Sequence, residues 1–417
     1  TASYCLAAFS NLPPVLHLGA GGPGAPMYLD SIESVFFILE THDAISLQQG
    51  RDLILIDPRG SGLSQPLLSC QRFVDNEIGR LSQNLTAEQE FESVRSDYLS
   101  CIDDFSDQGI DFKQYNSWQI MYDIEALRRA MKVEQWVLVG VSYATIYAQL
   151  VAANFPQTVE ALILDSTTFL ESEPHRSYVE QSLTPYRAML NYCDYSTACD
   201  KTPENFETRF WAVHQALNHH PISLDLRHPY RNSRLTYVLN GERMLAALLE
   251  GVYDSHLFVQ LPDIISQLED RKTELLEPHI NGSLGYLLDR TFGDVSSDAH
   301  YCYETHPYTD IEFIRTELEK LPEGYLRDSS LQWLGWGDYC DAMGIESGNP
   351  DMLQTGPIKQ PVLFLHGEHD PVTTISALLN RQSDFPNSQL VRFDLSHSVL
   401  TSSEKAEQEA ASFIRSR

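Results

Sequence analysis

The sequence predicts an α/β fold in which helices cover both faces of a mostly parallel sheet. Up to residue 166, and again near the C-terminus, short apolar runs of strand character alternate with segments of helical periodicity. Between about residues 166 and 356 this alternation stops and helical patterns dominate. We therefore expect a core in two parts, residues 1–166 and 357–417. A large, mainly helical cap of residues 167–356 is inserted before the last two strands.

The expected strands are short apolar runs. They lie at residues 14–18, 53–57, 137–141, 161–165, 361–366 and 389–394, and a further strand-like run occupies residues 4–9. The expected helices lie at residues 115–133, 144–155, 203–219, 241–252, 256–269 and 373–383, and from about 402 onward. Residues 66–114 are polar and irregular in pattern, so no regular element is predicted there. Functional groups should gather at the carboxyl ends of the strands.

The chain is globular and strongly acidic. Its residues are 42% hydrophobic, which excludes a disordered protein, and no apolar run approaches the roughly 18 residues that span a bilayer. The 58 acidic residues against 29 basic ones give a formal charge of −29, which opposes binding to a nucleic-acid backbone. We therefore expect neither nucleic acid nor a membrane as a partner, whereas a cationic substrate would be attracted.

Seven cysteines indicate disulfides rather than a zinc site, because none of them forms a C-x-x-C pair. The plausible bridges are Cys70 with Cys101, Cys193 with Cys199, and Cys302 with Cys340. Three disulfides would place the protein in an oxidising compartment, secreted or periplasmic. Cys5 is left over, and the chain begins with Thr1 rather than Met. We expect that an N-terminal segment, and with it the partner of Cys5, has been removed.

The strongest single motif is a turn around Ser142. The expected strand at 137–141 runs into Gly-Val-Ser142-Tyr-Ala, and an apolar, Ala-rich helix follows until Pro156. This strand–turn–helix context gives a G-x-S-x-G motif its meaning, because small residues let strand and helix pack closely while the turn exposes the serine. Ala144 replaces the last glycine. The pentapeptide alone is weak evidence, and a serine in an ordinary strand–helix loop is the alternative.

Two further strand ends complete the order Ser, Asp, His. Asp370 follows the next-to-last expected strand, and His397 follows the last one. A serine hydroxyl becomes a good nucleophile when an imidazole takes its proton, and a carboxylate holds the imidazole tautomer and stabilises its charged form. The sequence therefore predicts a catalytic triad of Ser142, Asp370 and His397. Asp394, at the end of the last strand itself, is the rival acid.

A glycine-rich turn at residues 19–24 follows an expected strand. No Gly-Lys-Ser/Thr follows it, so a phosphate loop is not indicated. Glycine permits the backbone conformations and the close approach that an N–H group facing a reacting oxygen requires. We expect an oxyanion hole formed by the backbone N–H groups of Gly22 in this turn and of Tyr143 after the nucleophile.

Four motifs lie at strand ends of the core. They are Ala20-Gly-Gly-Pro-Gly24, Asp57-x-Arg-Gly-x-Gly-x-Ser64, Gly140-x-Ser-Tyr-Ala144 and Gly367-Glu-His-Asp-Pro-Val-Thr373. Together they resemble the proline iminopeptidase family of α/β-hydrolases, and most of all its secreted tripeptidyl-aminopeptidase-like branch. Ala20 stands where the family has His. In the second motif we expect Asp57 and Arg59 to form a structural pair. The resemblance covers most of the core and is weak in the cap.

The resemblance implies an α/β-hydrolase fold and an exopeptidase that removes residues from the free N-terminus of short peptides. Members of the family use carboxylates of the cap to hold the substrate ammonium group, because an ammonium that leaves water needs a paired negative charge. Cys302-Tyr303-Glu304 resembles a Cys-x-Glu element of the branch. Glu304 is therefore the candidate for amine binding, and a surface glutamate beside a disulfide is the alternative. No metal or organic cofactor is implied.

Other functions use the same machinery, since a fold does not fix the substrate. An esterase or lipase-like enzyme would have an apolar acyl tunnel where an aminopeptidase has an acidic pocket. A non-catalytic binding module would usually lack a triad residue, and none is missing. An epoxide hydrolase or dehalogenase would carry Asp where this chain has Ser142. A serine aminopeptidase of the prolyl or tripeptidyl type is the preferred prediction, with an esterase as the main alternative.

Overall fold

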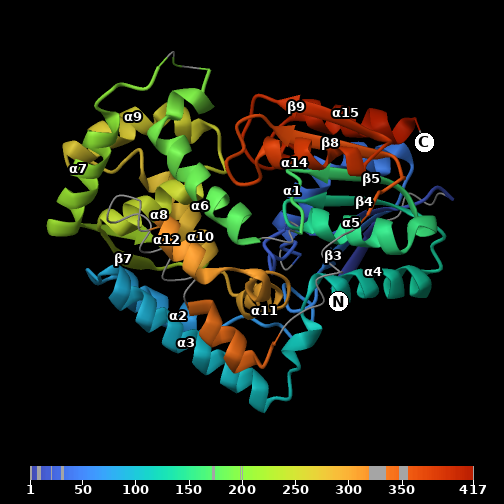
Figure 1. Ribbon diagram of the computed structural model, residues 1–417, viewed down its shortest axis with the longest axis horizontal. Helices are drawn as coiled ribbons and strands as arrows, with labels where there is room; N and C mark the ends of the chain where they lie inside the picture. The colour runs from blue at the N-terminus through green and yellow to red at the C-terminus, as the bar shows by residue number, and fades with distance from the viewer. Residues whose placement is uncertain are drawn as a thin grey trace.

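The computed structural model describes residues 2–6, 11–19, 21–29, 32–170, 174–197, 199, 201–318, 335–346 and 356–416. Across these residues a seven-stranded sheet forms the centre of the core (Figure 1). In spatial order its strands are β1 (Ala2–Leu6), β3 (Leu53–Asp57), β2 (Val15–His17), β4 (Trp136–Val141), β5 (Val159–Asp165), β8 (Val362–Gly367) and β9 (Ser388–Phe393). β1 is antiparallel to β3, and the other strands pair in parallel. The predicted fold class is confirmed.

The long insertion separates β5 from β8 in sequence but not in space. Asp165 at the end of β5 pairs with Val141 of β4 on one side and with Leu365 of β8 on the other. Because these three strands are parallel and adjacent, their carboxyl ends meet at one edge of the sheet. The turn that carries Ser142 and the loop that carries Asp370 both leave the sheet at this edge.

Helices cover both faces of the sheet. They are α1 (Ile32–His42), α4 (Ser117–Met131), α5 (Ala144–Asn154), α14 (Ile375–Arg381) and α15 (Glu404–Arg415). Leu138 of β4 packs in a buried cluster with α4, α5 and α14, whereas its neighbours Val137 and Val139 pack with α1 and α15. Since successive side chains of a strand point to opposite faces, a sheet that is covered on both sides requires such a continuous apolar run.

The chain between β5 and β8 builds a mainly helical cap. Its described elements are α6 (Pro174–Leu190), α7 (Phe206–His219), β6 (Ile222–Arg227), β7 (Arg234–Leu239), α8 (Gly241–Gly251), α9 (His256–Glu269), α10 (Glu277–Leu287), α11 (Asp294–Glu304) and α12 (Ile311–Leu318). These elements share a hydrophobic cluster of their own, separate from the two that flank the sheet. Figure 1 shows this assembly to one side of the sheet. The antiparallel hairpin of β6 and β7 was not expected.

The prediction for residues 66–114 is wrong. They form α2 (Gln71–Leu81) and α3 (Ala87–Asp107). Both helices contribute side chains to the hydrophobic cluster of the cap, so this part of the chain packs with the insertion that follows much later. Charged residues also lie between the two helices: buried Arg80 pairs with Glu77 at 2.7 Å and with Asp97 at 2.5 Å. Apolar residues nevertheless recur at three- and four-residue steps in both helices, so their periodicity was a usable signal that the prediction missed.

The three expected disulfides are present. They join Cys70 to Cys101, Cys193 to Cys199, and Cys302 to Cys340. The first ties the start of α2 to α3, and the last anchors α11, which carries Glu304. The side chain of Cys5 lies outside the described residues, as does Ala20, so the expectation of a lost partner for Cys5 stays a prediction.

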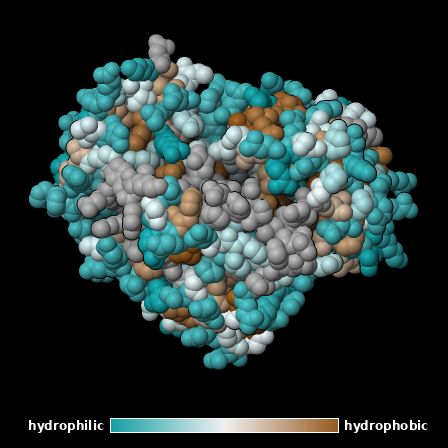
Figure 2. Space-filling model, viewed as in Figure 1, coloured by the Kyte–Doolittle hydropathy of each residue, from teal (hydrophilic) through white to brown (hydrophobic). Residues whose placement is uncertain are grey.

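The visible surface is mostly hydrophilic. Figure 2 shows hydrophilic residues over most of this face, with hydrophobic residues in small separate patches. Within the ranges given above, no helix combines the length and the apolar character needed to cross a membrane.

Two buried histidines lie where α1 packs on the sheet, and they should make the core sensitive to acid. The rings of His17 and His42 are 4.5 Å apart in an edge-on arrangement. Burial lowers the pKa of His17, and the charge of His42 lowers it further. Burial also lowers the pKa of His42, to about 4.

The unfolded chain therefore binds more protons than the native state between about pH 6.5 and pH 4, so stability is lost as the pH falls through this window. We expect His42→Gln to flatten the decrease in unfolding free energy over this window by about 3 kcal/mol, measured by urea denaturation at several pH values. His256→Gln, at an exposed position, is the control and should follow the wild type. Parallel pH dependences for all three proteins would contradict the prediction.

Candidate active site

Ser142 lies in a constrained turn between β4 and α5. Its φ of +54° falls in the left-handed region, which few residues other than glycine occupy and which often marks a functional position. The N–H group of Ser142 donates to the carbonyl oxygen of Asp165 at 2.9 Å. The carbonyl oxygen of Ser142 accepts from the N–H group and the hydroxyl of Thr145, at 3.0 Å and 2.6 Å. The backbone of the turn is thus fixed on both sides.

The structure explains why the two ends of the Ser142 motif differ. A Cβ atom on Gly140 would lie 2.8 Å from the carbonyl oxygen of Ala144, so the first position requires glycine. Ala144 itself is fully buried at the start of α5, with its methyl group in a hydrophobic cluster. One extra methyl group is therefore accommodated at the last position.

Asp370 and His397 are brought together from two loops. His397 Nδ1 lies 2.8 Å from Asp370 Oδ2, and both residues are buried. The other carboxylate oxygen of Asp370 accepts the N–H groups of Val372 and Thr373, at 2.8 Å and 2.9 Å. The Thr373 hydroxyl donates to Oδ2 at 2.7 Å. These bonds fix the carboxylate in the orientation that meets the imidazole.

The charges of Asp370 and His397 stabilise each other. Burial alone would raise the pKa of Asp370, but the charge and hydrogen bond of His397 outweigh it and lower the pKa to about 2. Burial alone would lower the pKa of His397, but the charge and hydrogen bond of Asp370 raise it above its ordinary 6.5. Asp370 therefore stays ionised at every physiological pH and stabilises a protonated His397.

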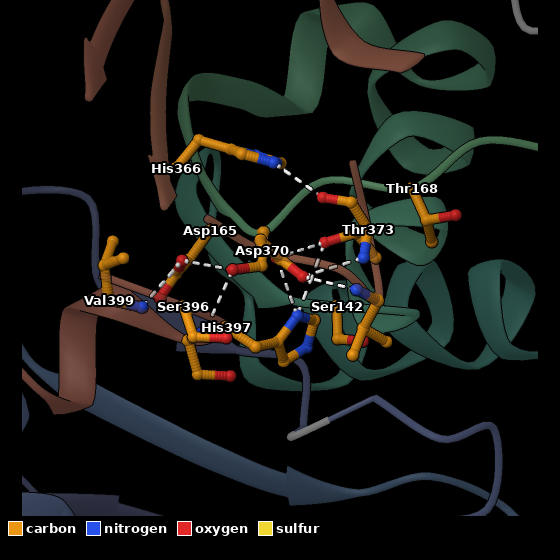
Figure 3. A network of polar contacts seen from close by, with 12 residues as sticks. Ser142, Asp165, Thr168, His366, Asp370, Thr373, Ser396, His397 and Val399 are labelled. Carbon is orange, nitrogen blue, oxygen red and sulfur yellow. Dashed lines mark hydrogen bonds and ion pairs between the residues drawn. The ribbon is translucent and has the colours of Figure 1, made fainter. Parts of the chain in front are cut away.

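Figure 3 shows the Ser142 side chain beside the imidazole ring of His397, whose Nδ1 faces Asp370. Since Nδ1 is engaged by the carboxylate, Nε2 is the nitrogen that can take a proton from the serine. On the cap side, the ring of Tyr253 packs edge-on against His397 with ring centroids 5.2 Å apart. Tyr253 follows α8 and is 46% exposed, so it presents an aromatic surface next to the histidine.

Asp394, the rival acid, has a different partner. Its carboxylate lies 2.7 Å from Nε2 of His369 and is largely exposed. Among the described contacts of His397, the only carboxylate that hydrogen-bonds the ring is that of Asp370. The geometry therefore favours Asp370 as the partner of His397.

The glycine-rich turn lies against the nucleophile turn. Gly21 has a φ of +105°, and a Cβ atom on it would lie 2.9 Å from both the Cβ atom of Ser142 and the backbone nitrogen of Tyr143. Gly22 follows with a φ of +103°. The two turns are therefore in close contact, and the oxyanion hole of Gly22 and Tyr143 stays a prediction from the sequence. Ala20, where the related family has His, lies outside the described residues.

Asp57 and Arg59 do not form the pair that the sequence suggested. Arg59 instead forms an ion pair with Asp123 of α4 at 2.6 Å. Asp57 accepts the N–H groups of Met27 and Leu63, at 2.7 Å and 2.8 Å. Asp57 therefore fixes two loops beside the end of β3, whereas Arg59 ties the turn after β3 to α4.

Glu304 is buried at the contact between cap and core, with 2% of its surface exposed. The alternative of a surface glutamate is therefore wrong. Its carboxylate accepts the N–H group and the hydroxyl of Ser117, at 2.5 Å and 2.9 Å, and the hydroxyl of Tyr143 at 2.5 Å. Burial raises the pKa of Glu304 to about 7, although these hydrogen bonds counteract it. A cap carboxylate thus touches the residue that follows the candidate nucleophile.

Several residues of the site were not predicted. Thr373 and Tyr253 hold the acid and the histidine, and Ser117 holds Glu304. Thr373 stands three residues after Asp370, within the same sequence motif. A hydroxyl at this spacing can hydrogen-bond to the carboxylate, so the spacing could have indicated Thr373. Tyr253 and Ser117 reach the site only through packing of the cap on the core, and nothing in their local sequence indicates it.

The sequence matches the family described as "alpha/beta hydrolase fold" over residues 23–253, more than half of the chain. The chain belongs to this family. This α/β-hydrolase is 21% identical over 410 residues to "Serine protease Hip1" of Mycobacterium tuberculosis, a match that covers 92% of this chain and 75% of that protein. It is also 27% identical over 152 residues to "Putative hydrolase YuaR" of Escherichia coli, covering 36% of this chain and 28% of that one.

Solved structures of other α/β-hydrolases align with this one. The enzyme MGS-M2 from a deep-sea metagenome library is 13% identical and aligns over 99% of this chain and 94% of its own, with a TM-score of 0.42. A mutant of the meta-cleavage product hydrolase CumD, also 13% identical, aligns over 100% of this chain and 94% of its own, with a TM-score of 0.43.

Among the described residues, no group of three or more His, Cys, Asp and Glu side chains is arranged to hold a metal ion. That the α/β-hydrolase works without a metal or an organic cofactor stays a prediction from the sequence.

We expect Ser142→Ala to abolish hydrolysis while the protein stays folded, because the change removes the hydroxyl that lies beside His397. Turnover of an activated ester and the circular dichroism spectrum measure the two quantities. Hydrolysis at a rate comparable with the wild type would remove Ser142 from the mechanism.

We expect kcat/KM to rise with pH through a single ionisation above pH 6.5, because the general base must be neutral and the pKa of His397 is raised. Asp370→Asn should lower kcat by about 10⁴-fold, since the charged imidazole loses its partner, and should move this ionisation to lower pH. Asp394→Asn is the matched control and should keep both the rate and the profile. The opposite ranking of the two variants would make Asp394 the acid.

Proposed function

We propose that this protein is a serine aminopeptidase that hydrolyses short peptides from a free N-terminus. The observation that carries the proposal is the buried pair of His397 and Asp370 beside the Ser142 turn. The similarity to a serine protease over 92% of the chain supports a peptidase rather than another hydrolase. The four motifs that resemble the proline iminopeptidase family, and its tripeptidyl-aminopeptidase-like branch, support an aminopeptidase of the prolyl or tripeptidyl type.

With Ser142, His397 and Asp370 as the triad, the proposed reaction has two stages, acylation and deacylation. Ser142 Oγ attacks the carbonyl carbon of the scissile bond, and its proton passes to His397 Nε2. The N–H groups of Tyr143 and Gly22 stabilise the negative oxygen of the tetrahedral intermediate. His397 then gives the proton to the departing amine, and the C–N bond breaks to leave an acyl-enzyme. Water attacks this ester with His397 again as the base, and the released acid restores Ser142.

Carboxylates of α11 support recognition of a substrate ammonium group. Glu304 lies at the inner end of the helix, next to the nucleophile turn. Asp298 lies about one and a half turns earlier, and the charges of both carboxylates raise the pKa of Tyr301 between them. Burial and the charge of Asp294 raise the pKa of Asp298 well above its ordinary range. An ammonium group bound among these acids would lower their pKa values and so favour their ionised forms. The paired negative charge would compensate the ammonium group for the hydration that it loses.

Two further features agree with a secreted peptidase. The three disulfides fit an oxidising compartment outside the cytoplasm. The formal charge of −29 favours cationic N-termini over anionic substrates. Short peptides with a free amine are therefore the partners that we propose.

The deciding experiment compares alanyl, prolyl and Ala-Ala-Pro anilides, each free or N-acetylated, with butyrate and octanoate esters. We expect cleavage of the anilides only when the amine is free, and the anilide that is cleaved fastest shows how many residues leave per cut. Cleavage of the esters alone would leave the triad in place and make the protein an esterase. The absence of any hydrolysis would favour a binding module.

We expect Glu304→Gln to lower kcat/KM for free-amine anilides by about 10- to 100-fold, because the amine loses a charged partner. The new amide would keep an acceptor for the Ser117 N–H group, and the hydroxyls of Ser117 and Tyr143 can reverse their hydrogen bonds, so the fold should persist. N-acetylated esters should lose less than about threefold, since they carry no ammonium group. Glu312→Gln, on the exposed part of α12, is the control. Equal losses on both substrate classes would remove Glu304 from the amine site.

A further inference from the structure

Asp165 lies between the turn that carries the serine and the loop that carries the histidine. It is the last residue of β5 and is fully buried. Its backbone pairs with β4 on one side and β8 on the other. Its carbonyl oxygen accepts the N–H group of Ser142 at 2.9 Å. The main chain of Asp165 therefore fixes the first atoms of the nucleophile turn.

The side chain of Asp165 holds the segment that follows His397. Asp165 Oδ1 accepts the N–H group of Val399 at 3.1 Å, and Oδ2 accepts that of Leu400 at 2.8 Å (Figure 3). Two backbone donors in the turn after the histidine thus end on one buried carboxylate. Hydrogen bonds to a charged acceptor are about twice as strong as neutral ones, and burial of the carboxylate strengthens them further.

Ser166 adds a third bond to the same segment. Its hydroxyl donates to Asp165 Oδ1 at 3.0 Å and accepts the N–H group of Ser398 at 2.8 Å. Ser166 and Ser398 have φ values of +50° and +59°. Such conformations are unfavourable for residues other than glycine and persist only where the surroundings impose them. The bonds between Asp165, Ser166 and the loop supply that constraint.

The loop needs this support because of where it starts. It leaves β9, which is the last strand of the sheet and pairs only with β8 among the described strands. A displacement of about 1 Å between reacting groups can lower a rate about 100-fold. We propose that Asp165 is a positioning residue that holds the His397 loop against the Ser142 turn, a role that rests on the proposed triad.

Because Asp165 is charged, its proposed role predicts an effect on the pH profile that a purely structural hydrogen bond would not have. The groups that face His397 are the carboxylates of Asp370 and Asp165, the imidazole of His366 and the phenol of Tyr253. Burial lowers the pKa of His397, whereas the charges of Asp370 and then of Asp165 raise it. Removing the negative charge of Asp165 should therefore move the acid limb of the pH profile to lower pH.

The test compares Asp165→Asn with Asp394→Asn, the same chemical change in the loop that carries His397 but on its exposed side. The readouts are kcat and KM for an activated ester between about pH 5 and pH 9, and the rate at which a fluorophosphonate labels Ser142. We expect Asp165→Asn to lower kcat and the labelling rate by about 10- to 100-fold with KM nearly unchanged, and to shift the acid limb to lower pH. Asp394→Asn should stay within about twofold of the wild type, as an exposed change should.

Equal labelling rates and equal acid limbs in the wild type and Asp165→Asn would overturn the role of Asp165 alone. A wild type that is not labelled at all would instead overturn the triad, and the proposal with it. If Asp165→Asn does not fold, Ser166→Ala replaces it, since this change removes only the bonds to Ser398 and Asp165. A labelling rate lowered several-fold in folded Ser166→Ala would support the proposal, and an unchanged rate would overturn it.

Discussion

The parallel pairing of β4, β5 and β8 is the constraint on which the site depends. It delivers Ser142, Asp165 and the loop of Asp370 to one edge of the sheet, although the last of these comes from beyond a long insertion. Adjacent residues of a strand are about 3.3 Å apart. A slip of one residue in this register would exceed the tolerance of every hydrogen bond in the site. The apolar residues on both faces of these strands therefore serve the chemistry as well as the core, because their close packing against the helices opposes such a slip.

The cap touches the catalytic edge through polar groups as well as apolar ones. Glu304 of α11 reaches Ser117 of α4 and Tyr143 of the nucleophile turn. Burying a carboxylate without a paired cation costs free energy. For this reason the pKa of Glu304 is raised to about 7. A substrate ammonium would reduce it. Under the proposed function, the same acid would hold cap and core together before binding and gain stabilisation when a free N-terminus arrives.

Much of the fold could be predicted because the core strands are continuous apolar runs and each ends in a recognisable turn. The order of Ser142, Asp370 and His397 along the chain could also be read, since each follows such a run. What escaped prediction depends on contacts between distant segments. The helices α2 and α3 show apolar residues at helical spacing and could have been predicted, but their packing with the cap and the burial of Arg80 between two acids depend on such contacts. Arg59 pairs with Asp123 because α4 packs beside β3, and no spacing rule links the two residues.

Two buried carboxylates, those of Asp370 and Asp165, raise the pKa of His397, but they lie in different surroundings. Asp370 faces the imidazole directly, and the charge of His397 overcomes the effect of burial, so the pKa of Asp370 falls to about 2. Asp165 faces backbone N–H groups and a hydroxyl, which offset burial only in part, so its pKa rises to about 6. Asp370 therefore remains a full negative charge for a developing imidazolium over the whole working range of pH. Asp165 hydrogen-bonds fixed dipoles and influences His397 through its charge alone, and this influence is smaller than that of Asp370.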